Sequence, residues 1–190
     1  MAGKKESSFI NMVLTLFVVA VVAALALGGV YTITKEPIAI AKQKKLEAAI
    51  KAVLPDFDSI QTRKVKDASG DDSLVFYFAS KDGDLLGAAI KTYTMKGFGG
   101  RIELMVGILE DGTINNTAVL SHKETPGLGD KMDVKKSDFP KQFIGKNPES
   151  FKLKVSKDGG DVDAITAATI SSRAFCDAVK RATDTFESQK

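Results

Sequence analysis

The chain has 190 residues, 27% of them charged, and a formal net charge of +3 with both signs interspersed. This balance is typical of one domain of ordinary size beside any anchor, and it predicts no nucleic-acid partner. A single cysteine, Cys176, excludes an intrachain disulfide and cysteine-rich zinc sites, and a single histidine, His122, excludes a histidine-rich metal site. We therefore predict no metal site, and any redox chemistry must come from a bound cofactor.

The N-terminal segment from Ser7 to Thr34 carries no charge and is rich in large apolar residues. A bilayer core of about 30 Å is crossed by about 20 helical residues, so this segment is long enough to span it. A cleaved signal peptide is the alternative, because the Ala-Leu-Ala at residues 24–26 resembles a cleavage site. The segment exceeds the roughly 7–15 apolar residues of a signal peptide, however, and we predict a retained anchor in contact with membrane lipid.

The positive charges on the two sides of the anchor are nearly balanced, with Lys4 and Lys5 before it and Lys35 after it. The very short N-terminal side favours a signal-anchor, which leaves the following domain outside the cytoplasm. We therefore expect residues 1–34 to form a cytoplasmic tip and transmembrane anchor, and residues 35–190 to form one extracytoplasmic domain.

The segment after the anchor is predicted to be an amphipathic helix that is entered through Pro37 and ended by Pro55. Its apolar residues share one broad face: Ile40, Leu46, Ile50 and Val53. Residues 62–72, which follow, are polar and are predicted to be turn-like.

Two pairs of apolar, β-rich segments come next, and each pair is joined by a turn that contains Asp-Gly. The first pair covers residues 73–80 and 85–93, and the second covers residues 101–110 and 113–122. An Asp-Gly turn between two such segments is typical of a β-hairpin, so we predict two hairpins.

The C-terminal third is predicted to contain a short helix over residues 137–146, a final strand over 151–155 and a long helix from about Ser171 to Ser188. Apolar residues of the long helix recur at steps of four, three and four and form one stripe: Phe175, Val179, Ala182 and Phe186. The whole pattern predicts an α+β fold, in which one N-terminal transmembrane helix is followed by a mostly antiparallel sheet flanked by helices.

Two of the connecting loops have compositions that suit a ligand, although each also has a plain structural interpretation. The glycines at residues 97–100 permit close approach of the backbone to a ligand, or simply form a long hairpin turn. In residues 121–132, glycine and proline surround Leu128, and Glu124 and Thr125 add a carboxylate and a hydroxyl. This second loop suits a flat ligand of mixed polarity, or it is an ordinary surface turn.

A third loop, residues 163–175, places four hydroxyls at the predicted start of the last helix: Thr166, Thr169, Ser171 and Ser172. Hydroxyls at this position are commonly helix N-caps, which explains one of the two serines. The N-terminus of a helix also attracts anions, because its first N–H groups are free and its dipole favours negative charge. The pattern therefore fits a helix cap, a phosphate-binding site or a phosphorylated hydroxyl.

Taken together, the anchor and the three loops resemble the FMN-binding domains of the Rnf complex G subunit and of the C subunit of the sodium-translocating NADH:quinone oxidoreductase. The motif of that family is Asp-x-x-Thr/Ser-Gly-Ala-Thr-x-Thr/Ser, and it corresponds here to Asp163, Thr166, Ala167, Ala168, Thr169 and Ser171. The stretches "ETPGLG" (124–129) and "GFGGRIELMVGI" (97–108) are similar to two further signatures. The resemblance covers essentially the whole chain, and the short domain is more similar to the Rnf G subunit.

The resemblance implies covalent FMN, joined through its phosphate to the last hydroxyl of the motif, which is Ser171. It also implies a flavin transferase that uses FAD as donor and releases AMP. The cofactor-binding residues implied in this way are Ser171, Thr169, Thr166, Ala168, Asp163, Glu124, Thr125, Gly127, Leu128 and Gly129. Among them, Thr166 and Thr169 are expected to shape the loop or bind phosphate oxygens, and the 124–129 loop is expected to lie against the flavin ring.

Two positions depart from the family pattern. The family usually has glycine where this chain has Ala167, and it often has threonine where this chain has Ser171. Because alanine tolerates a positive φ poorly, the backbone at Ala167 is expected to be either ordinary or strained.

The function implied by the resemblance is that of an electron-transfer subunit in an Rnf-type ion-translocating ferredoxin:NAD oxidoreductase. Such a subunit would be a single-pass protein of the bacterial inner membrane, with its main domain on the periplasmic side and other membrane subunits as partners. It would catalyse little alone. The alternatives are a flavoprotein subunit of a quinone-reducing, sodium-pumping complex, and a non-redox anchored binding or assembly module that has lost flavinylation.

Overall fold

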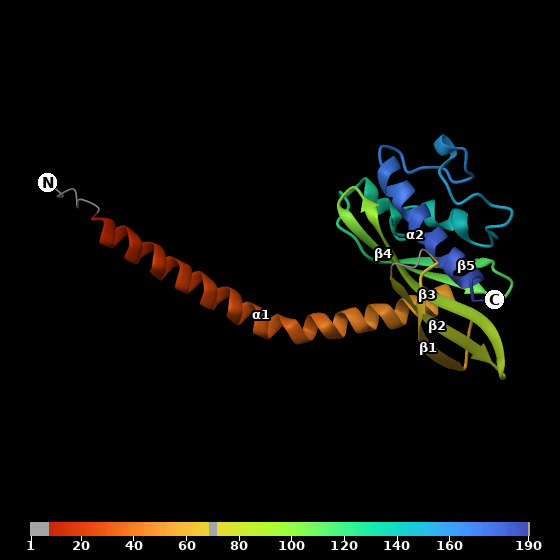
Figure 1. The fold of residues 1–190 in the computed structure, drawn as a ribbon, viewed down its shortest axis with the longest axis horizontal. Helices are drawn as coiled ribbons and strands as arrows, with labels where there is room; N and C mark the ends of the chain where they lie inside the picture. Colours follow the sequence, from red (N-terminus) through yellow and green to blue (C-terminus); the bar gives the residue numbers. More distant parts are fainter. Residues whose placement is uncertain (1–7, 69–71, 190) are drawn as a thin grey trace. The chain divides into compact units, whose positions relative to one another are not determined.

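The protein is described by a computed structural model that covers residues 8–68 and 72–189 (Figure 1). The chain divides into two compact units, residues 1–44 and residues 45–190. The N-terminal tip with Lys4 and Lys5, on which the predicted orientation depends, lies outside the described residues.

The first unit consists of most of helix α1, Phe9–Val53. Its large apolar side chains, from Phe9 to Ile33, are exposed, as expected for a surface that meets lipid. In the described part of the chain, α1 is the one helix long and apolar enough to cross a membrane. Hydroxyl groups within it are satisfied by the helix itself: Thr32 Oγ1 donates to Gly29 O (2.8 Å) and Thr34 Oγ1 to Val30 O (2.7 Å). Such internal pairing is what a bilayer requires of polar groups.

The predicted start of a separate helix at Pro37 is wrong, because α1 runs through Pro37 without interruption. Proline lacks a backbone N–H donor, and for this reason it is common in the first turn of a helix, where that donor has no partner. Here the apolar segment before Pro37 is already helical, so Pro37 lies inside α1 and not at the start of a second helix. Of the predicted apolar face, Ile50 and Val53 are buried, whereas Ile40 is 51% exposed.

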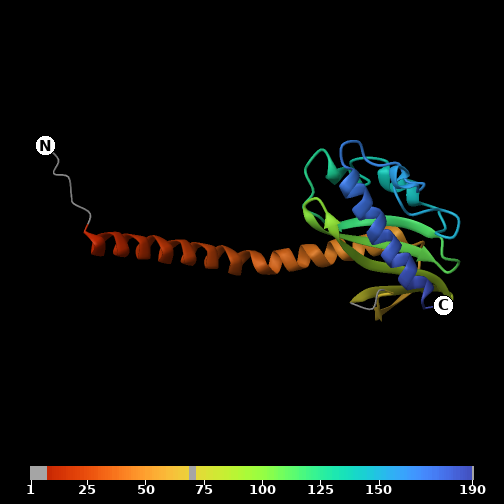
Figure 2. The same ribbon diagram turned by 45° about the horizontal axis from the view of Figure 1, so that its top comes forward.

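The second unit is built on a five-stranded sheet in which all neighbouring strands are antiparallel and follow the chain order β1-β2-β3-β4-β5 (Figure 2). The α+β prediction is therefore confirmed. Both predicted hairpins are present as β2–β3 and β4–β5. The strands are β1 (Ser59–Lys66), β2 (Ser73–Lys81), β3 (Asp84–Gly97), β4 (Gly100–Leu109) and β5 (Ile114–Ser121).

Helices cover both faces of this sheet. Helix α2, Thr169–Glu187, crosses one face and packs on β3 and β4 (Figures 1 and 2). The end of α1 covers the other face, where Ile50 and Val53 pack with Ala89 and Met105. Because neighbouring residues of a strand point to opposite faces, β3 and β4 contribute to both layers.

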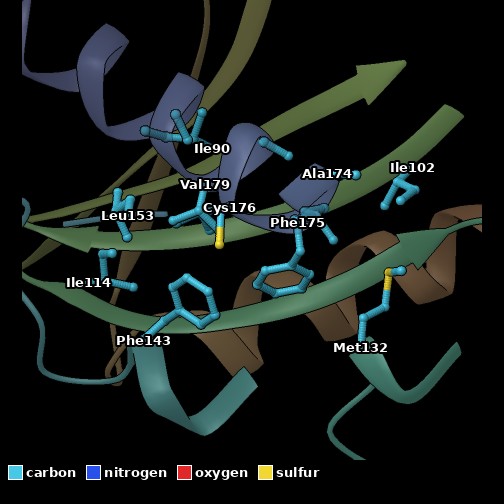
Figure 3. Packing of buried hydrophobic residues seen from close by; sticks show 14 of the residues in the cluster. Ile90, Ile102, Ile114, Met132, Phe143, Leu153, Ala174, Phe175, Cys176 and Val179 are labelled. Carbon is cyan, nitrogen blue, oxygen red and sulfur yellow. The ribbon is translucent and has the colours of Figure 1, made fainter. Parts of the chain in front are cut away.

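The main core lies between the sheet and α2. Figure 3 shows the side chains of Phe175, Cys176 and Val179 pointing from α2 toward Phe143 and Ile114. The ring of Phe175 packs on that of Phe143, with centroids 5.0 Å apart. The predicted apolar stripe is confirmed, since Phe175, Val179, Ala182 and Phe186 are all buried. This packing fixes α2 from its second turn onward and so positions its first turn.

Two sequence-based assignments in this unit are wrong. Residues 62–66, predicted to be turn-like, belong to the edge strand β1, in which only Val65 is buried. An exposed edge strand carries no apolar alternation, and its basic residues are typical of an edge protected from further pairing. Residues 151–155 form no strand; Val155 makes only an isolated bridge to Val162. Leu153 and Val155 are buried as in a strand, but from a looped segment beside α2.

Short 3-10 helices complete the described part of the second unit. The predicted short helix near residue 140 is present as η2, Phe139–Phe143. The others are η1, Gly129–Met132, which follows the 124–129 loop, and η3, Ser156–Asp158.

Candidate functional site

The three loops singled out in the sequence meet at one pocket of about 340 Å³ at the N-terminal end of α2. They are the β3–β4 turn, the segment after β5 and the segment that leads into α2, and they lie at the same end of the sheet in Figures 1 and 2. The pocket is lined by Phe98, Glu124, Thr125, Leu128, Gly129, Ala167, Ala168, Thr169, Ile170 and Ser171.

The first loop is a tight connection in which Gly97 pairs with Gly100 across the β3–β4 hairpin. The plain interpretation as a hairpin turn is therefore confirmed. The same turn also contributes to the pocket, because it holds Phe98 there with 70% of the residue exposed. The Gly99 N–H, next to it, donates to Glu124 Oε1 at 2.8 Å.

The second loop turns between Thr125 and Leu128, where the Leu128 N–H donates to Thr125 O at 3.2 Å. Pro126 and Gly127 occupy the two central positions, and Gly127 has a φ of 77°. Proline followed by a residue of positive φ is the pattern of a type II turn. The turn presents the Leu128 side chain, 40% exposed, to the pocket.

An ion pair between a buried aspartate and a half-exposed lysine holds the end of the second loop. Asp130 is 4% exposed, and its Oδ2 accepts a hydrogen bond from Lys136 Nζ at 2.6 Å. This hydrogen bond holds the pKa of Asp130 below its ordinary value, against the opposing effect of burial. Asp130 directly follows the pocket-lining Gly129, and its charge is paired with Lys136 and so stabilises the loop.

The third loop reaches α2 through a residue in the left-handed region, Ala167, with a φ of 62°. This is the motif position at which the family usually has glycine, so the strained alternative is the one that the structure adopts. A left-handed alanine costs about 1–2 kcal/mol relative to the right-handed region. The chain thus adopts at Ala167 a conformation that glycine would permit without this strain, at a cost in stability.

Neither Ser171 nor Ser172 caps α2, so that part of the cap interpretation is wrong. The helix begins two residues earlier than predicted, at Thr169, and its N-cap position is Ala168, which makes no side-chain cap hydrogen bond. Ser172 instead ties the loop to the first turn: its Oγ donates to Ala168 O (3.0 Å) and accepts from the Ile165 N–H (2.9 Å). Because the first N–H groups of a helix have no intrahelical acceptor, this end of α2 remains favourable for an anion.

A buried pair of side chains joins the second loop to the third. Ser171 Oγ donates a hydrogen bond to Glu124 Oε2, and the two residues are 3% and 5% exposed. The backbone at Gly129 passes so close that a Cβ there would collide with Ser171 Oγ and would lie 2.7 Å from Glu124 Oε2. Glycine at position 129 is therefore required by the pair rather than by its own backbone angles.

Three of the residues implied as cofactor-binding do not line the pocket. Asp163 lies in the preceding loop, where its N–H donates to Gln142 Oε1 at 2.8 Å. Thr166 is exposed outside the pocket, and Gly127 shapes the turn. Conversely, sequence reasoning missed Phe98, Ala167 and Ile170 as lining residues. Each lies inside a singled-out motif, so exposed apolar side chains within glycine-rich or hydroxyl-rich loops were the available signal.

Thiol or metal chemistry would require the buried cysteine or the acidic side chains of the described residues. Cys176 is 2% exposed, and burial raises the pKa of its thiol to about 12, so it is not a nucleophile at neutral pH. Across residues 8–68 and 72–189, no group of three or more His, Cys, Asp or Glu side chains is placed to hold a metal ion.

Comparison with known proteins agrees with this geometry. Residues 97–184, which contain all three loops, match the FMN-binding domain family. The chain is 38% identical over 183 residues to the G subunit of the ion-translocating oxidoreductase complex of Aliivibrio fischeri (strain ATCC 700601 / ES114), covering 90% of this chain and 86% of that protein. It is 36% identical over 182 residues to the G subunit from Vibrio atlanticus, covering 90% and 86%, and 36% identical over 180 residues to that from Shewanella baltica, covering 87% and 85%.

Proposed function

Because the chain belongs to the family of G subunits of ion-translocating oxidoreductase complexes, we propose that it is the electron-transfer subunit of an Rnf-type complex with covalently attached FMN. The observation that carries this proposal is the convergence of three separate motifs on one pocket at the first turn of α2. Bound FMN supplies redox chemistry that accepts electrons singly or in pairs, and the surrounding protein tunes its potential.

The residues around the pocket fit FMN. A volume of about 340 Å³ lies within the usual range of small-molecule sites, roughly 300–1,000 Å³. Phe98, Leu128 and Ile170 offer apolar surface for a ring system, since each is at least 40% exposed. The first turn of α2 offers N–H groups to a phosphate. Apolar and anion-binding surfaces therefore meet in one place, as a flavin phosphate requires.

Ser171 is the proposed acceptor of the phosphate. Of the four hydroxyls in the motif, Thr169 and Ser171 line the pocket, whereas Thr166 and Ser172 do not. Ser172 Oγ is also occupied by its bonds to the loop backbone. The pocket thus supports an acceptor at Thr169 or Ser171, and the family motif selects Ser171.

Flavin attachment is tested by producing the chain with and without a flavin transferase. With the transferase, we expect a yellow protein whose chromophore stays bound in acid and whose mass rises by one FMN less one water. A colourless protein of unmodified mass, made beside a transferase that modifies a known target, would support the non-redox alternative. The left-handed backbone at Ala167 supports flavin attachment over that alternative, because the chain adopts here a conformation that the family's glycine would readily allow.

We infer that the chain is a single-pass membrane protein, because α1 is the one helix of the described residues that could span a membrane and the relatives are subunits of ion-translocating complexes. We further propose that residues 35–190 lie on the periplasmic side, where a flavin transferase and the other subunits of the complex would meet them. Alkaline phosphatase fused after Lys190 should then be active in cells, and β-galactosidase fused at the same point should be inactive. The reverse pattern would place the domain in the cytoplasm and overturn this part of the proposal.

A further inference from the structure

Glu124 is the one ionisable residue among those that line the pocket. It is 5% exposed, and each of its carboxylate oxygens has a donor: Oε2 accepts from Ser171 Oγ, and Oε1 accepts from the Gly99 N–H at 2.8 Å. A buried carboxylate that bonds a single hydroxyl, in a pocket that otherwise contains no charge, is an arrangement suited to removing the proton of that hydroxyl.

The surrounding backbone is shaped to hold this carboxylate in place. A Cβ at Gly97 would lie 2.7 Å from Glu124 Oε1, and one at Gly129 would lie 2.7 Å from Oε2. The Glu124 N–H donates to His122 Nδ1 at 3.1 Å, which fixes the backbone from which the side chain extends. The carboxylate thus lies against glycines of two loops, and it is hydrogen-bonded to the third loop through Ser171.

Ser171 is distinguished from the other motif hydroxyls by this contact. Ser172 Oγ donates to a backbone carbonyl, which cannot take a proton at neutral pH. Among the four motif hydroxyls, all within the described part of the chain, Ser171 is the one that donates to a carboxylate. The same contact would therefore both choose the acceptor and activate it.

We propose that Glu124 is the general base for attachment of FMN to this chain, an inference that rests on the proposed covalent flavin. Ser171 Oγ forms a bond to the phosphorus of the FMN half of FAD, and the phosphoanhydride bond to AMP breaks. The proton of Ser171 passes to Glu124 Oε2, AMP leaves, and the proton then passes to solvent. The base for the modification thus belongs to the modified protein, and the transferase supplies and orients FAD.

The test is the initial rate of covalent FMN incorporation into the full chain in detergent, with purified flavin transferase and FAD, followed by intact mass. General-base catalysis contributes about 10²–10⁴-fold, so Glu124→Gln should be modified at least about 100-fold more slowly than wild type. Glutamine keeps the shape: its oxygen can accept from the Gly99 N–H and its NH2 can donate to Ser171 Oγ, so a role in positioning alone predicts a rate within a few fold of wild type. That outcome would overturn the inference.

A matched control is available at a second serine–glutamate pair on the sheet. Glu103 Oε2 accepts from Ser121 Oγ at 3.2 Å, outside the pocket. Glu103→Gln should leave the rate of incorporation unchanged. If Glu103→Gln slows incorporation as much as Glu124→Gln does, the effect is not specific to the pocket and the inference fails.

Glu124→Asp decides the matter if Glu124→Gln does not fold. It keeps the charge but withdraws the carboxylate from Ser171 by one methylene, and a misplacement of about 1 Å can cost about 100-fold. We expect a rate lowered about 10–100-fold in a chain that is folded at the assay temperature, and a wild-type rate would overturn the inference. Failure of the wild-type chain to acquire FMN would instead overturn the proposed function, so the two failures are distinguishable.

Discussion

The polar residues near the C-terminal end of helix α2 stabilise the fold, whereas those at its N-terminal end line a pocket. In the C-terminal half, Arg181 Nη2 lies 2.7 Å from Asp67 Oδ2, and Thr185 Oγ1 donates to Asp67 Oδ1 at 3.0 Å. These polar groups bond one another and connect α2 to the segment after β1. In the first turn, by contrast, no side chain of the described residues caps the helix, and Ser171 and Glu124 line an open pocket.

The difference shows how one helix can be both a structural element and part of a site. The second turn of α2 is held by ring packing, with Phe175 against Phe139 and Phe143 at centroid distances of 5.3 and 5.0 Å. Since the helix is fixed from its second turn to the C-terminal end, its first turn does not need a cap for the helix to form. Substitution of the pocket-lining hydroxyl Ser171 in the first turn should therefore change flavin attachment, and substitutions in the C-terminal half should change stability.

The largest expected effect is complete loss of attachment in Ser171→Ala. Alanine removes the oxygen that would bond the phosphate, so intact mass in the presence of a transferase should show no FMN increment, whereas Ser171→Thr should keep it. The adjacent control is Ser172→Ala, which should be modified fully. It should lose about 1–2 kcal/mol of stability, because the buried Ile165 N–H loses its acceptor.

If Ser171→Ala still gains the mass of FMN, the acceptor is a different hydroxyl, and peptide mapping should then identify Thr169. Thr169 is the other hydroxyl that lines the pocket. That result would also remove the basis for Glu124 as the base, because Glu124 contacts Ser171.

Local patterns in the sequence predict those parts of the fold in which apolar residues recur regularly or a clear turn signal joins two apolar segments. β2 to β5 were predicted because β-rich apolar segments flank Asp-Gly turns, and α2 was predicted because its buried residues recur with the period of a helix. β1 was missed because it is an edge strand that buries only Val65. The strand predicted at residues 151–155 was wrong because the burial of Leu153 and Val155 has the period of a strand without a neighbouring strand to pair with.

The sequence identifies the loops that form the candidate site, but it does not predict how these loops contact one another. Each loop carries a visible motif, yet the contact between Glu124 and Ser171 joins residues 47 apart in sequence. No local pattern specifies such a pairing, because it depends on how the sheet and α2 bring the loops together. The start of α2 was misplaced for a related reason: serine is a common N-cap, but here Ser172 bonds backbone groups of the preceding loop instead.

At the opposite end of α2, Arg181→Met should reduce stability without affecting the flavin. Asp67 is 4% exposed, and loss of its cationic partner should cost about 3 kcal/mol, as is usual when one member of a buried pair is removed. Arg181 also stacks on the ring of Tyr93, with its guanidinium 4.3 Å from the centroid, and methionine replaces only part of that contact. Urea unfolding of the detergent-solubilised chain would measure the loss.

The control for this pair is Arg181→Lys, which keeps the charge but not the planar, stacked geometry, and should lose less stability than Arg181→Met. FMN incorporation into both variants should equal that of wild type at a temperature where both are folded. A strong decrease in incorporation would show that the two ends of α2 are coupled rather than independent.

Within the pocket, Leu128→Asp should change the flavin without preventing its attachment. A carboxylate near the ring disfavours the electron-rich reduced form, so the midpoint potential should fall. Partial exposure of the position limits the effect to about 1.4 kcal/mol, or about 30 mV for a two-electron couple. Val134→Asp is the control, because Val134 is 48% exposed but does not line the pocket. Equal potentials in wild type and Leu128→Asp would mean that the second loop does not contact the ring.

The smallest effect concerns Ala167, the left-handed residue that leads into the first turn of α2. Glycine removes a strain of about 1–2 kcal/mol from the folded state. It also gives the unfolded chain more freedom, which offsets about 0.4–1 kcal/mol of that gain. Ala167→Gly should therefore be more stable than wild type by up to about 1 kcal/mol in urea unfolding. Ala164→Gly, in the same loop but without a positive φ, should be less stable than wild type. If Ala167→Gly is also destabilised, the left-handed backbone at the entrance to the pocket is not the conformation of the folded chain.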